Sequence, residues 1–265
     1  MIVDGKKLAQ EVIAELQGKA TGETVCFVSF LHSPESKSFI RIKTKVAEQL
    51  GIKAETVFLD AENTEQAIQK LSEVTAKPYQ GIVVQLPLPG SFDSQRVLDA
   101  VPLLPDIDVL STEAKQLYAQ GQLVRVPPVA WAVSHILHVN NIDLQQKNIV
   151  VLGKGKLVGE PVTAMLDRKK ISYKAIDITT DEQEKRQLLL NADVIISGIG
   201  MAHYLKPEMI KDGVVLIDAG TSEDFGELKG DIDPACADKA SFYTPVPGGV
   251  GPLTVVGLYK NLLTK

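Results

Sequence analysis

The sequence has few cysteines and no long apolar run, and both shortages exclude classes of protein. Only two cysteines, Cys26 and Cys236, occur among 265 residues, and they are isolated, without metal-ligand spacing. We therefore expect two reduced structural thiols rather than a disulfide framework or a zinc site. No apolar stretch is long enough for a spanning helix, and the residues that follow Met1 lack a signal-peptide core. These absences favour a cytoplasmic protein with no membrane partner.

An excess of positive charge is also missing. The formal net charge is -5 at pH 7, and lysine and arginine form no cluster that would follow a phosphate backbone. We therefore expect no nucleic acid partner, and the composition fits a globular enzyme. A length of 265 residues is comfortable for two units that each bury a core.

Segments of helical period alternate with short β-branched runs, which predicts an α/β fold. The expected helices cover residues 6–16, 35–50, 64–74, 129–139 and 157–167. The expected strands cover residues 25–30, 54–59, 81–84, 148–152, 172–176, 194–196 and 214–217. Prolines punctuate the zone between the two series of elements, so we place a domain boundary near residue 142.

The segment Tyr243-Thr-Pro-Val-Pro-Gly-Gly-Val-Gly-Pro252, the Pro/Gly loop, is too rich in proline and glycine to suit a regular helix or strand. Its prolines fix φ and its glycines permit close approach, so we predict a preshaped loop whose amides meet a planar ligand. A helix is expected to follow, with Pro252 in its first turn. Its apolar face would comprise Leu253, Val256, Leu258, Leu262 and Leu263. The competing interpretation is a tight turn before a terminal helix.

The predicted helix over residues 35–50 holds a second candidate site. Phe39 and Lys43 are four residues apart and share one face, with Ser36 one turn earlier. A lysine shielded by apolar neighbours loses hydration of its charged form, so its pKa falls and it can exchange protons near neutrality. The alternative is an ordinary solvated lysine.

Two further segments offer polar side chains. Val83-Val-Gln-Leu-Pro-Leu-Pro89 predicts a parallel strand that delivers Gln85 to its carboxyl end, where sites of α/β proteins form. Pro105-Asp-Ile-Asp108 supplies carboxylates, which can accept two N–H groups as a fork. The alternatives are a surface glutamine and two turn-capping aspartates. No histidine lies at ligand spacing from the aspartates, so no metal is expected.

A glycine-rich turn predicts a nucleotide site. The apolar residues 149–152 lead into Gly153-Lys-Gly-Lys-Leu-Val-Gly159, a strand that turns through glycines into a helix whose amides would face a pyrophosphate. The spacing differs from the usual dinucleotide fingerprint, and an ordinary strand-to-helix turn is the alternative. The glycine-ended strands at Ser197-Gly-Ile-Gly200 and Ile217-Asp-Ala-Gly220 are places where a nicotinamide or its ribose would approach backbone.

The strand expected over residues 172–176 is followed directly by Asp177, where an acidic side chain would accept hydrogen bonds from the adenosine ribose hydroxyls. This favours NAD, because the carboxylate would repel the 2′-phosphate of NADP unless Lys154 or Lys156 offset it. The alternative is an aspartate that caps a turn.

These motifs resemble, in order, those of the bifunctional methylenetetrahydrofolate dehydrogenase/methenyltetrahydrofolate cyclohydrolase family, from Asp4 to Leu263. The resemblance implies two α/β domains with a cleft between them. Residues 1–142 with the C-terminal helix 252–265 would form the folate-binding catalytic domain. Residues 143–251 would form a Rossmann-like NAD(P)-binding domain with a doubly wound parallel sheet. The family is usually a homodimer through its cofactor domains.

The resemblance also implies residue roles. In the catalytic set, Lys43 is the catalytic group, Gln85 hydrogen-bonds it and Asp108 binds the pterin ring. The substrate-binding set would be Phe39, Pro247, Gly248, Gly249, Gly251, Pro252 and Thr254. The cofactor-binding set would be Gly153, Lys154, Gly155, Val158, Gly159, Asp177, Ser197, Gly198 and Gly220. The cofactor would be NAD or NADP, the substrate a tetrahydrofolate derivative, and no metal is implied.

The chain departs from the family pattern at several positions. Phe39 stands where the family has a tyrosine, so stacking on the ligand is kept and a hydroxyl is lost. Val109 replaces a glycine and Gly155 a common serine, and residues 30–35 and 127–130 also differ. Two alternatives therefore stay open: a monofunctional dehydrogenase without cyclohydrolase activity, and a catalytically silent folate- or nucleotide-binding protein.

Overall fold

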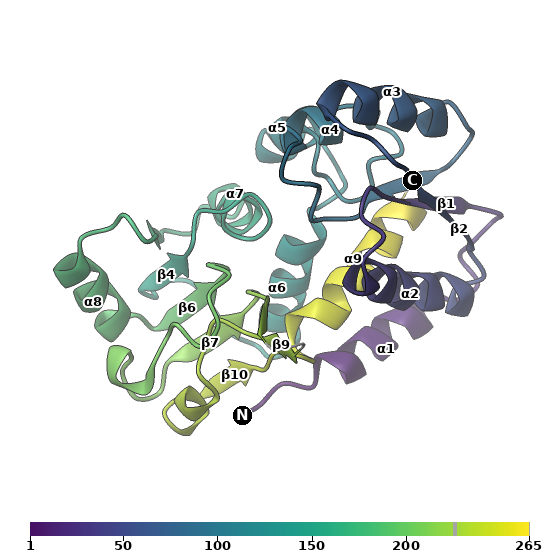
Figure 1. Cartoon of the computed structure of the whole chain (residues 1–265). Helices are drawn as coiled ribbons and strands as arrows, with labels where there is room; N and C mark the ends of the chain where they lie inside the picture. Colours follow the sequence, from purple (N-terminus) through teal and green to yellow (C-terminus); the bar gives the residue numbers. More distant parts are fainter. Residues whose placement is uncertain (225–226, 265) are drawn as a thin grey trace. The chain divides into compact units, whose positions relative to one another are not determined.

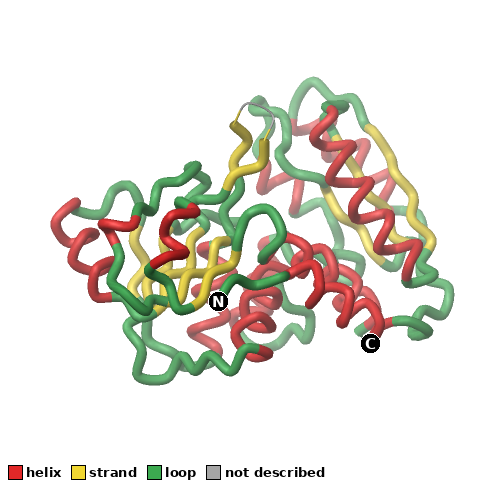
Figure 2. Tube along the Cα trace, turned by 90° about the horizontal axis from the view of Figure 1, so that it is seen from below, coloured by secondary structure: helices red, strands yellow, loops and turns green. Residues whose placement is uncertain are grey.

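The computed structural model describes residues 1–224 and 227–264, which divide into two compact units. The lysine unit, named after Lys43, comprises Glu11–Pro128 and Val255–Lys265. The glycine-loop unit comprises Met1–Gln10 and Val129–Thr254. Each unit has its own parallel sheet, drawn as a separate group of strands in Figure 2. Two helices, α1 (Gly5–Leu16) and α9 (Val250–Leu263), contribute residues to both units.

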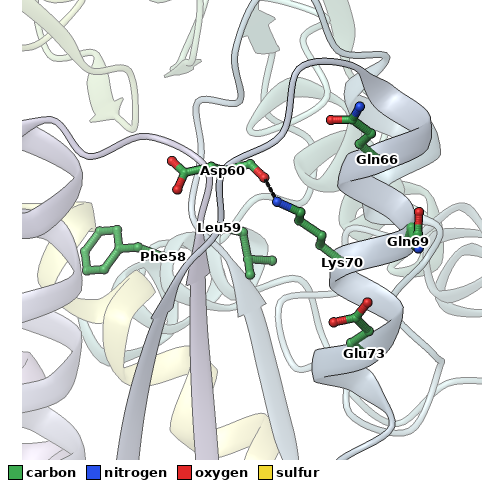
Figure 3. A pocket seen from close by; sticks show the side chains of 7 residues that line it. All are labelled: Phe58, Leu59, Asp60, Gln66, Gln69, Lys70 and Glu73. Atoms are coloured by element: carbon green, nitrogen blue, oxygen red, sulfur yellow. Dashed lines mark hydrogen bonds between the residues drawn. The ribbon is translucent and has the colours of Figure 1, made fainter.

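The lysine unit is built on a three-stranded parallel sheet in the order β2-β1-β3. These strands span Thr24–Ser29 (β1), Lys53–Phe58 (β2) and Gly81–Val84 (β3). The helices α2 (Pro34–Gln49) and α3 (Thr64–Thr75) cover opposite faces of the sheet (Figures 1 and 3). The short helices α4 (Ser94–Leu98) and α5 (Thr112–Ala119) follow. Every residue of β3 is buried, as expected of a parallel strand covered on both faces.

Local sequence explains where α2 begins. Ser33 is the N-cap: its side chain accepts a hydrogen bond from the backbone N–H of Ser36 at 3.2 Å. Pro34 occupies the first helical position, where its missing N–H costs nothing. On the inner face Ile40 is buried. The hydroxyl of Thr44, four residues later, donates a hydrogen bond to the Ile40 carbonyl at 3.0 Å. The turn that carries Lys43 is therefore fixed by ordinary capping and packing.

The glycine-loop unit has a five-stranded parallel sheet in the order β10-β7-β6-β4-β5. Its strands are Ile149–Leu152 (β4), Lys174–Ile176 (β5), Val194–Ser197 (β6), Val215–Asp218 (β7) and Phe242–Thr244 (β10). Because β5 and β6 flank β4 on opposite sides, the strand order reverses at β4. In such doubly wound sheets ligands bind at the carboxyl ends of the strands beside this reversal.

Helices and short elements complete the glycine-loop unit (Figure 1). Its α-helices include α6 (Pro128–Val139), α7 (Gly159–Arg168) and α8 (Glu182–Asn191). Two 3₁₀ helices span Pro207–Met209 and Pro234–Asp238. An antiparallel pair joins β8 (Ser222–Asp224) to β9 (Glu227–Lys229).

The boundaries of the two compact units differ from those of the predicted domains. The sequence places the boundary near residue 142, whereas the structure groups residues from Val129 onward with the glycine-loop unit. It also places the first ten residues in that unit, because Val3 N–H donates to the Tyr243 carbonyl at 2.9 Å and extends the sheet edge at β10. The assignment of functional domains at residues 1–142 and 143–251 stays a prediction.

The expectation of an irregular loop over residues 243–252 is partly wrong. Tyr243 and Thr244 belong to β10, and α9 begins at Val250, so only residues 245–249 are irregular. Pro252 is the third residue of α9, where proline is tolerated because the N–H groups of the first turn have no partner within the helix.

Both cysteines are free and buried. Burial raises the pKa of Cys26 to about 11 and that of Cys236 to about 12, which keeps the two thiols protonated at neutral pH. None of the helices in the described residues is long and apolar enough to cross a membrane. The same residues contain no group of three or more histidine, cysteine, aspartate or glutamate side chains that could hold a metal ion.

Candidate functional site

The side chains of Lys43 and Gln85 meet in the lysine unit. Lys43 lies in the middle of α2 and its Nζ donates to Gln85 Oε1 at 2.9 Å. Gln85 directly follows β3, its backbone N–H donates to the Val28 carbonyl at 2.7 Å, and it is 6% exposed. Its own Nε2 donates to the Leu86 carbonyl at 2.6 Å, which assigns the amide orientation and leaves Oε1 for the lysine. The contact implied by the family resemblance is therefore present.

Asp108 shares an electrostatic environment with Lys43. Burial lowers the pKa of Lys43, and the charge of the Asp108 carboxylate opposes this change. Burial raises the pKa of Asp108 to about 6, against the lowering effect of Lys43 and with a smaller raising effect from Asp106. An amine and a carboxyl group whose pKa values are drawn toward neutrality are typical of a site that moves protons.

The two aspartates of the 105–108 segment have different surroundings. Asp106 is 3% exposed, and its carboxylate accepts hydrogen bonds from Ser111 N at 2.9 Å and Ser111 Oγ at 2.6 Å. Asp106 therefore anchors the start of α5. Asp108 is half-buried, so it is the aspartate of this pair that can accept a ligand's N–H groups.

Two other predicted features of this site are the ring of Phe39 and the loop position Val109. Phe39 lies on α2 one turn before Lys43 and is 38% exposed, so part of its side chain is accessible to a ligand. Val109 has φ 57°, a left-handed conformation that a β-branched residue rarely adopts, and it is 1% exposed. The backbone beside Asp108 thus has the conformation that a glycine would adopt easily.

Two residues of α9 contact the backbone of this site, and the sequence patterns did not single them out. Tyr259 is fully buried and its hydroxyl donates to the backbone carbonyl of Lys43. Asn261 is 6% exposed, and its amide contacts the backbone of Ile107 and Val126. The available sequence signal was weak: a buried tyrosine and asparagine within an otherwise apolar helical face.

A hollow of about 550 Å³ also occurs in the lysine unit, between α3 and the end of β2 (Figure 3). In it Lys70 extends from α3 and donates to the main-chain carbonyl of Asp60. Its lining residues are Phe58, Leu59, Asp60, Gln66, Gln69, Lys70 and Glu73. None of these is a predicted site residue, and their mixture of charges selects no ligand class.

The glycine turn of the other unit follows β4 at the strand reversal. Gly153 has φ 104°, and a Cβ there would lie 2.7 Å from the Gly198 carbonyl oxygen. A Cβ on Gly159 would lie 2.1 Å from the Gly153 carbonyl oxygen, and one on Gly198 would lie 2.2 Å from the Val158 side chain. Gly153 and Gly159 are therefore packed against backbone and Gly198 against the Val158 side chain, and glycine is required for each approach.

Gly155 differs from the other glycines of the turn. A Cβ at this position would meet no atom within 4 Å, so the turn is open there. The open position lies four residues before the first residue of α7, and the positive end of that helix's dipole favours an anion there. The turn therefore fits a pyrophosphate, and it would also fit the serine that the family commonly has.

Asp177 directly follows β5 and forms several contacts. Its Oδ1 accepts Thr179 N at 2.9 Å and Thr179 Oγ1 at 2.6 Å, and its Oδ2 lies 3.2 Å from Lys154 Nζ. The hydrogen bonds from Thr179 lower the pKa of Asp177 to about 2, so its carboxylate is ionised at neutral pH. The carboxylate predicted to bind ribose and the lysine predicted to offset a phosphate thus already form an ion pair.

Buried carboxylates organise the strand ends at Ser197 and Gly220. Ser197 is fully buried and its Oγ donates to Asp231 Oδ2 at 2.8 Å, so the side chain is turned inward. Asp231 also accepts backbone N–H groups from Ile199 at 2.7 Å and Met201 at 2.9 Å. A Cβ on Gly220 would lie 1.9 Å from Asp231 Oδ2. Asp231, which the sequence did not reveal, therefore shapes the loop predicted to lie beside the nicotinamide.

The irregular part of the Pro/Gly loop is packed against the start of the chain. A Cβ on Gly5 would lie 1.8 Å from the Gly249 carbonyl oxygen, so Gly5 is required by this loop although the sequence gave no sign of it. Gly248 has φ 108°, while a Cβ on Gly251 would meet nothing within 4 Å. Thr254 Oγ1 donates to the Val250 carbonyl at 3.2 Å. The predicted substrate residues 247–254 thus belong to the glycine-loop unit, whereas Phe39 belongs to the lysine unit.

Comparisons with known proteins agree over nearly the whole chain. Residues 3–108 match the catalytic domain of tetrahydrofolate dehydrogenase/cyclohydrolase, and residues 127–265 match the NAD(P)-binding domain of the same family. The bifunctional protein FolD of Methanosarcina mazei is 34% identical over 273 residues, which cover 99% of this chain and 94% of the relative.

Two solved structures show the same fold. The bifunctional enzyme FolD, methylenetetrahydrofolate dehydrogenase/cyclohydrolase, of Campylobacter jejuni has a TM-score of 0.91 at 27% identity and covers 99% of this chain and 97% of its own. The Trypanosoma brucei N5,N10-methylenetetrahydrofolate dehydrogenase-cyclohydrolase, solved with NADP cofactor and inhibitor, has a TM-score of 0.90 at 28% identity and covers 99% and 96%. With both family domains matched in order, this chain belongs to the tetrahydrofolate dehydrogenase/cyclohydrolase family.

Proposed function

We propose that this protein oxidises 5,10-methylenetetrahydrofolate with NAD(P)⁺ and hydrolyses the resulting methenyltetrahydrofolate to 10-formyltetrahydrofolate. The observation that carries the proposal is the 2.9 Å hydrogen bond from Lys43 to Gln85, with the Asp108 carboxyl in the same electrostatic environment. Family membership supplies the substrate class, since both the catalytic and the NAD(P)-binding domain are matched.

In the oxidation the protein mainly binds and orients. A bound NAD(P)⁺ supplies the hydride acceptor, and the glycine turn at Gly155 fits its pyrophosphate. Asp108 would accept the N–H groups of the pterin, and Phe39 would stack on an aromatic plane of the folate. The glycine backbone of residues 248–251 would pack against the same substrate. Such positioning makes hydride transfer effectively intramolecular.

In the hydrolysis Lys43 would manage the proton. Water adds to the methenyl carbon and loses one proton. The C–N5 bond then breaks as N5 takes up a proton and the hydroxyl of the adduct loses its own to become the formyl oxygen, so that one proton is released overall. Burial favours the neutral amine of Lys43, which can take up the first proton and return one. Gln85 Oε1 would hold the amine in orientation through its hydrogen bond. The proposed route uses no metal ion.

We favour NAD over NADP as the cofactor. The ionised Asp177 suits ribose hydroxyls and repels a 2′-phosphate, which supports NAD. Lys154, 3.2 Å from that carboxylate, is the side chain that would reduce the repulsion if NADP were used. By family resemblance we also propose a homodimer through the glycine-loop units and a cytoplasmic location, which sedimentation and cell fractionation would test.

A dehydrogenase without cyclohydrolase activity is the second candidate, and Phe39 favours it. The hydroxyl that the family's tyrosine would place near the lysine is missing, and water activation depends on the hydrogen bonds around that lysine. A catalytically silent binding protein is less compatible, because Lys43 and Gln85 are both kept and are hydrogen-bonded.

Separate assays of the two reactions test the proposal. We expect reduced nicotinamide to form from methylenetetrahydrofolate, and methenyltetrahydrofolate to be hydrolysed faster than its background rate. Lys43→Met should lower the rate of hydrolysis by about 100-fold or more, since general acid–base catalysis contributes roughly that factor. Hydride transfer should stay measurable in this variant. Oxidation without hydrolysis would establish the monofunctional alternative. Binding of folate and nucleotide without either reaction would overturn the proposal.

A further inference from the structure

We propose that Tyr259 and Asn261 of α9 are positioning residues that hold Lys43 and Asp108 in their working geometry. The proposal rests on the proposed function, because it concerns the same lysine and aspartate. Both residues lie in the lysine unit and come from a helix that contributes no member of the predicted catalytic set.

Tyr259 reaches the candidate catalytic lysine through its main chain. Its side chain is fully buried, and its hydroxyl donates to the Lys43 carbonyl, 216 residues away in sequence. That carbonyl lies in the middle of α2, where an intrahelical hydrogen bond is already available to it, so helix formation does not need the second donor. The contact instead fixes the rotation and height of the turn that carries the Lys43 side chain.

Asn261 holds the segment that carries Asp108. Its Nδ2 donates to the carbonyls of Ile107 and Val126, each at 2.8 Å, and its Oδ1 accepts Val126 N–H at 3.1 Å. One buried amide thus joins three separate segments and satisfies the backbone group next to Asp108. Arg125 supports the same segment, because its guanidinium donates to the Leu104 carbonyl at 2.6 Å and to the Asp106 carbonyl at 3.1 Å.

The two contacts lie two residues apart on α9 and act on the two opposite charges of the site. The energy between a buried amine and a carboxylate depends steeply on their separation, and the Lys43–Gln85 hydrogen bond tolerates only a few tenths of an ångström. A shift of α2 against the 104–108 segment would therefore change both the protonation of Lys43 and the docking of the pterin. Lys43 and Asp108 are therefore both held in place by contacts from the same helix, α9.

The test uses Tyr259→Phe and Asn261→Ala in the full-length protein, with both reactions assayed. Tyr259→Phe should lower kcat for methenyl hydrolysis by about tenfold and move the acid limb of its pH profile, with KM changed less, because a small misplacement of a catalytic group has effects of this size. Asn261→Ala should raise KM for the folate by about tenfold in both reactions, since it loosens the Asp108 segment.

Matched controls remove side chains of the same kind elsewhere. Tyr118→Phe alters a buried tyrosine on α5 of the same unit, and Asn140→Ala removes an amide that donates to the Ile136 carbonyl at 2.8 Å. Both should lower the melting temperature without changing pH profile or KM. The same pattern in the α9 variants, lower stability with kinetics unchanged, would overturn the proposal.

The outcomes also separate this proposal from the proposed function. Failure of the function shows as an inactive wild-type protein, whereas failure of the positioning role shows as active wild type with kinetically normal variants. If Asn261→Ala does not fold, Tyr259→Phe decides alone, because it removes a single oxygen atom and keeps the buried ring.

Discussion

We propose that cofactor choice depends on the ion pair between Asp177 and Lys154, and Asp177→Ser tests this proposal. The Asp177 carboxylate is ionised and lies 3.2 Å from Lys154 Nζ. The 2′-phosphate of NADP would therefore be a second anion beside a lysine that already has an ion-pair partner. For a phosphate of charge about −2 at roughly 5 Å in a water-exposed site, the repulsion from one carboxylate weakens binding by a factor of about 20. Its removal is therefore worth about a 20-fold gain in NADP use.

The same substitution weakens NAD binding. A hydrogen bond from a ribose hydroxyl to a charged acceptor contributes about 1.5 kcal/mol, so kcat/KM for NAD should fall roughly tenfold. Together the two effects predict a change in the NADP-to-NAD ratio of kcat/KM of about 100-fold or more.

The assay follows reduced nicotinamide at fixed methylenetetrahydrofolate with each cofactor in turn. Lys154→Ala is the matched control, because it removes the cation and should lower the use of NADP alone. A ratio that Asp177→Ser leaves within about threefold of wild type would refute the electrostatic account of selectivity.

Three further predictions concern Asp108 and its neighbour Val109. KM for the folate should rise roughly tenfold between pH 7 and pH 5, because a carboxyl of pKa about 6 loses its charge there; a flat KM would contradict this role. Stability should fall as the pH rises from about 4 to 6, because the raised folded-state pKa means that the folded state holds a proton that the unfolded chain has lost. The free energy of unfolding, measured with urea, should decrease by up to about 3 kcal/mol over that range. At Val109, with φ 57°, the glycine variant should be at least as stable as the alanine variant and should keep wild-type KM, since the left-handed backbone costs roughly 1–2 kcal/mol for a residue with a Cβ. A glycine variant about 1 kcal/mol less stable than the alanine variant would show that no such strain exists.

Segments with a clear apolar signal were predicted well, and polar ones were not. The helix expected over residues 6–16 is Gly5–Leu16, because its apolar residues recur with helical period. The strand expected over residues 81–84 is Gly81–Val84, because it is a short continuous apolar run. The patterns did not indicate α8 (Glu182–Asn191), whose first half is charged and whose leucines are adjacent rather than spaced. Three-residue strands such as β10 (Phe242–Thr244) are too short to show a period.

For the site, sequence was informative about groups that act through their own type and position. The glycines at 153 and 159 and the lysine at 43 have recognisable spacing, and the family resemblance linked Lys43 to Gln85. Sequence did not indicate groups that act through tertiary contacts. Asn261 is hydrogen-bonded to the backbone of residues 135 and 154 positions earlier in the chain. Asp231 accepts a hydrogen bond from Ser197, 34 residues earlier, at the end of its strand. No local pattern records such contacts, because the partners are backbone atoms that every residue has.

The departures from the family pattern differ in what they can change. At Gly155 a Cβ would meet open space, so the main chain is the same with or without a serine side chain. At Val109 the chain keeps φ 57° despite the β-branched side chain, so the backbone beside Asp108 has the shape that a glycine allows. At Phe39 the ring remains 38% exposed for stacking, but a polar atom has been removed. We expect all three changes to preserve the positioning on which hydride transfer relies, whereas the proposed hydrolysis also relies on hydrogen bonds to water and Lys43. Of these three departures we therefore expect Phe39 to bear on the balance of the two reactions, through the hydrolysis alone.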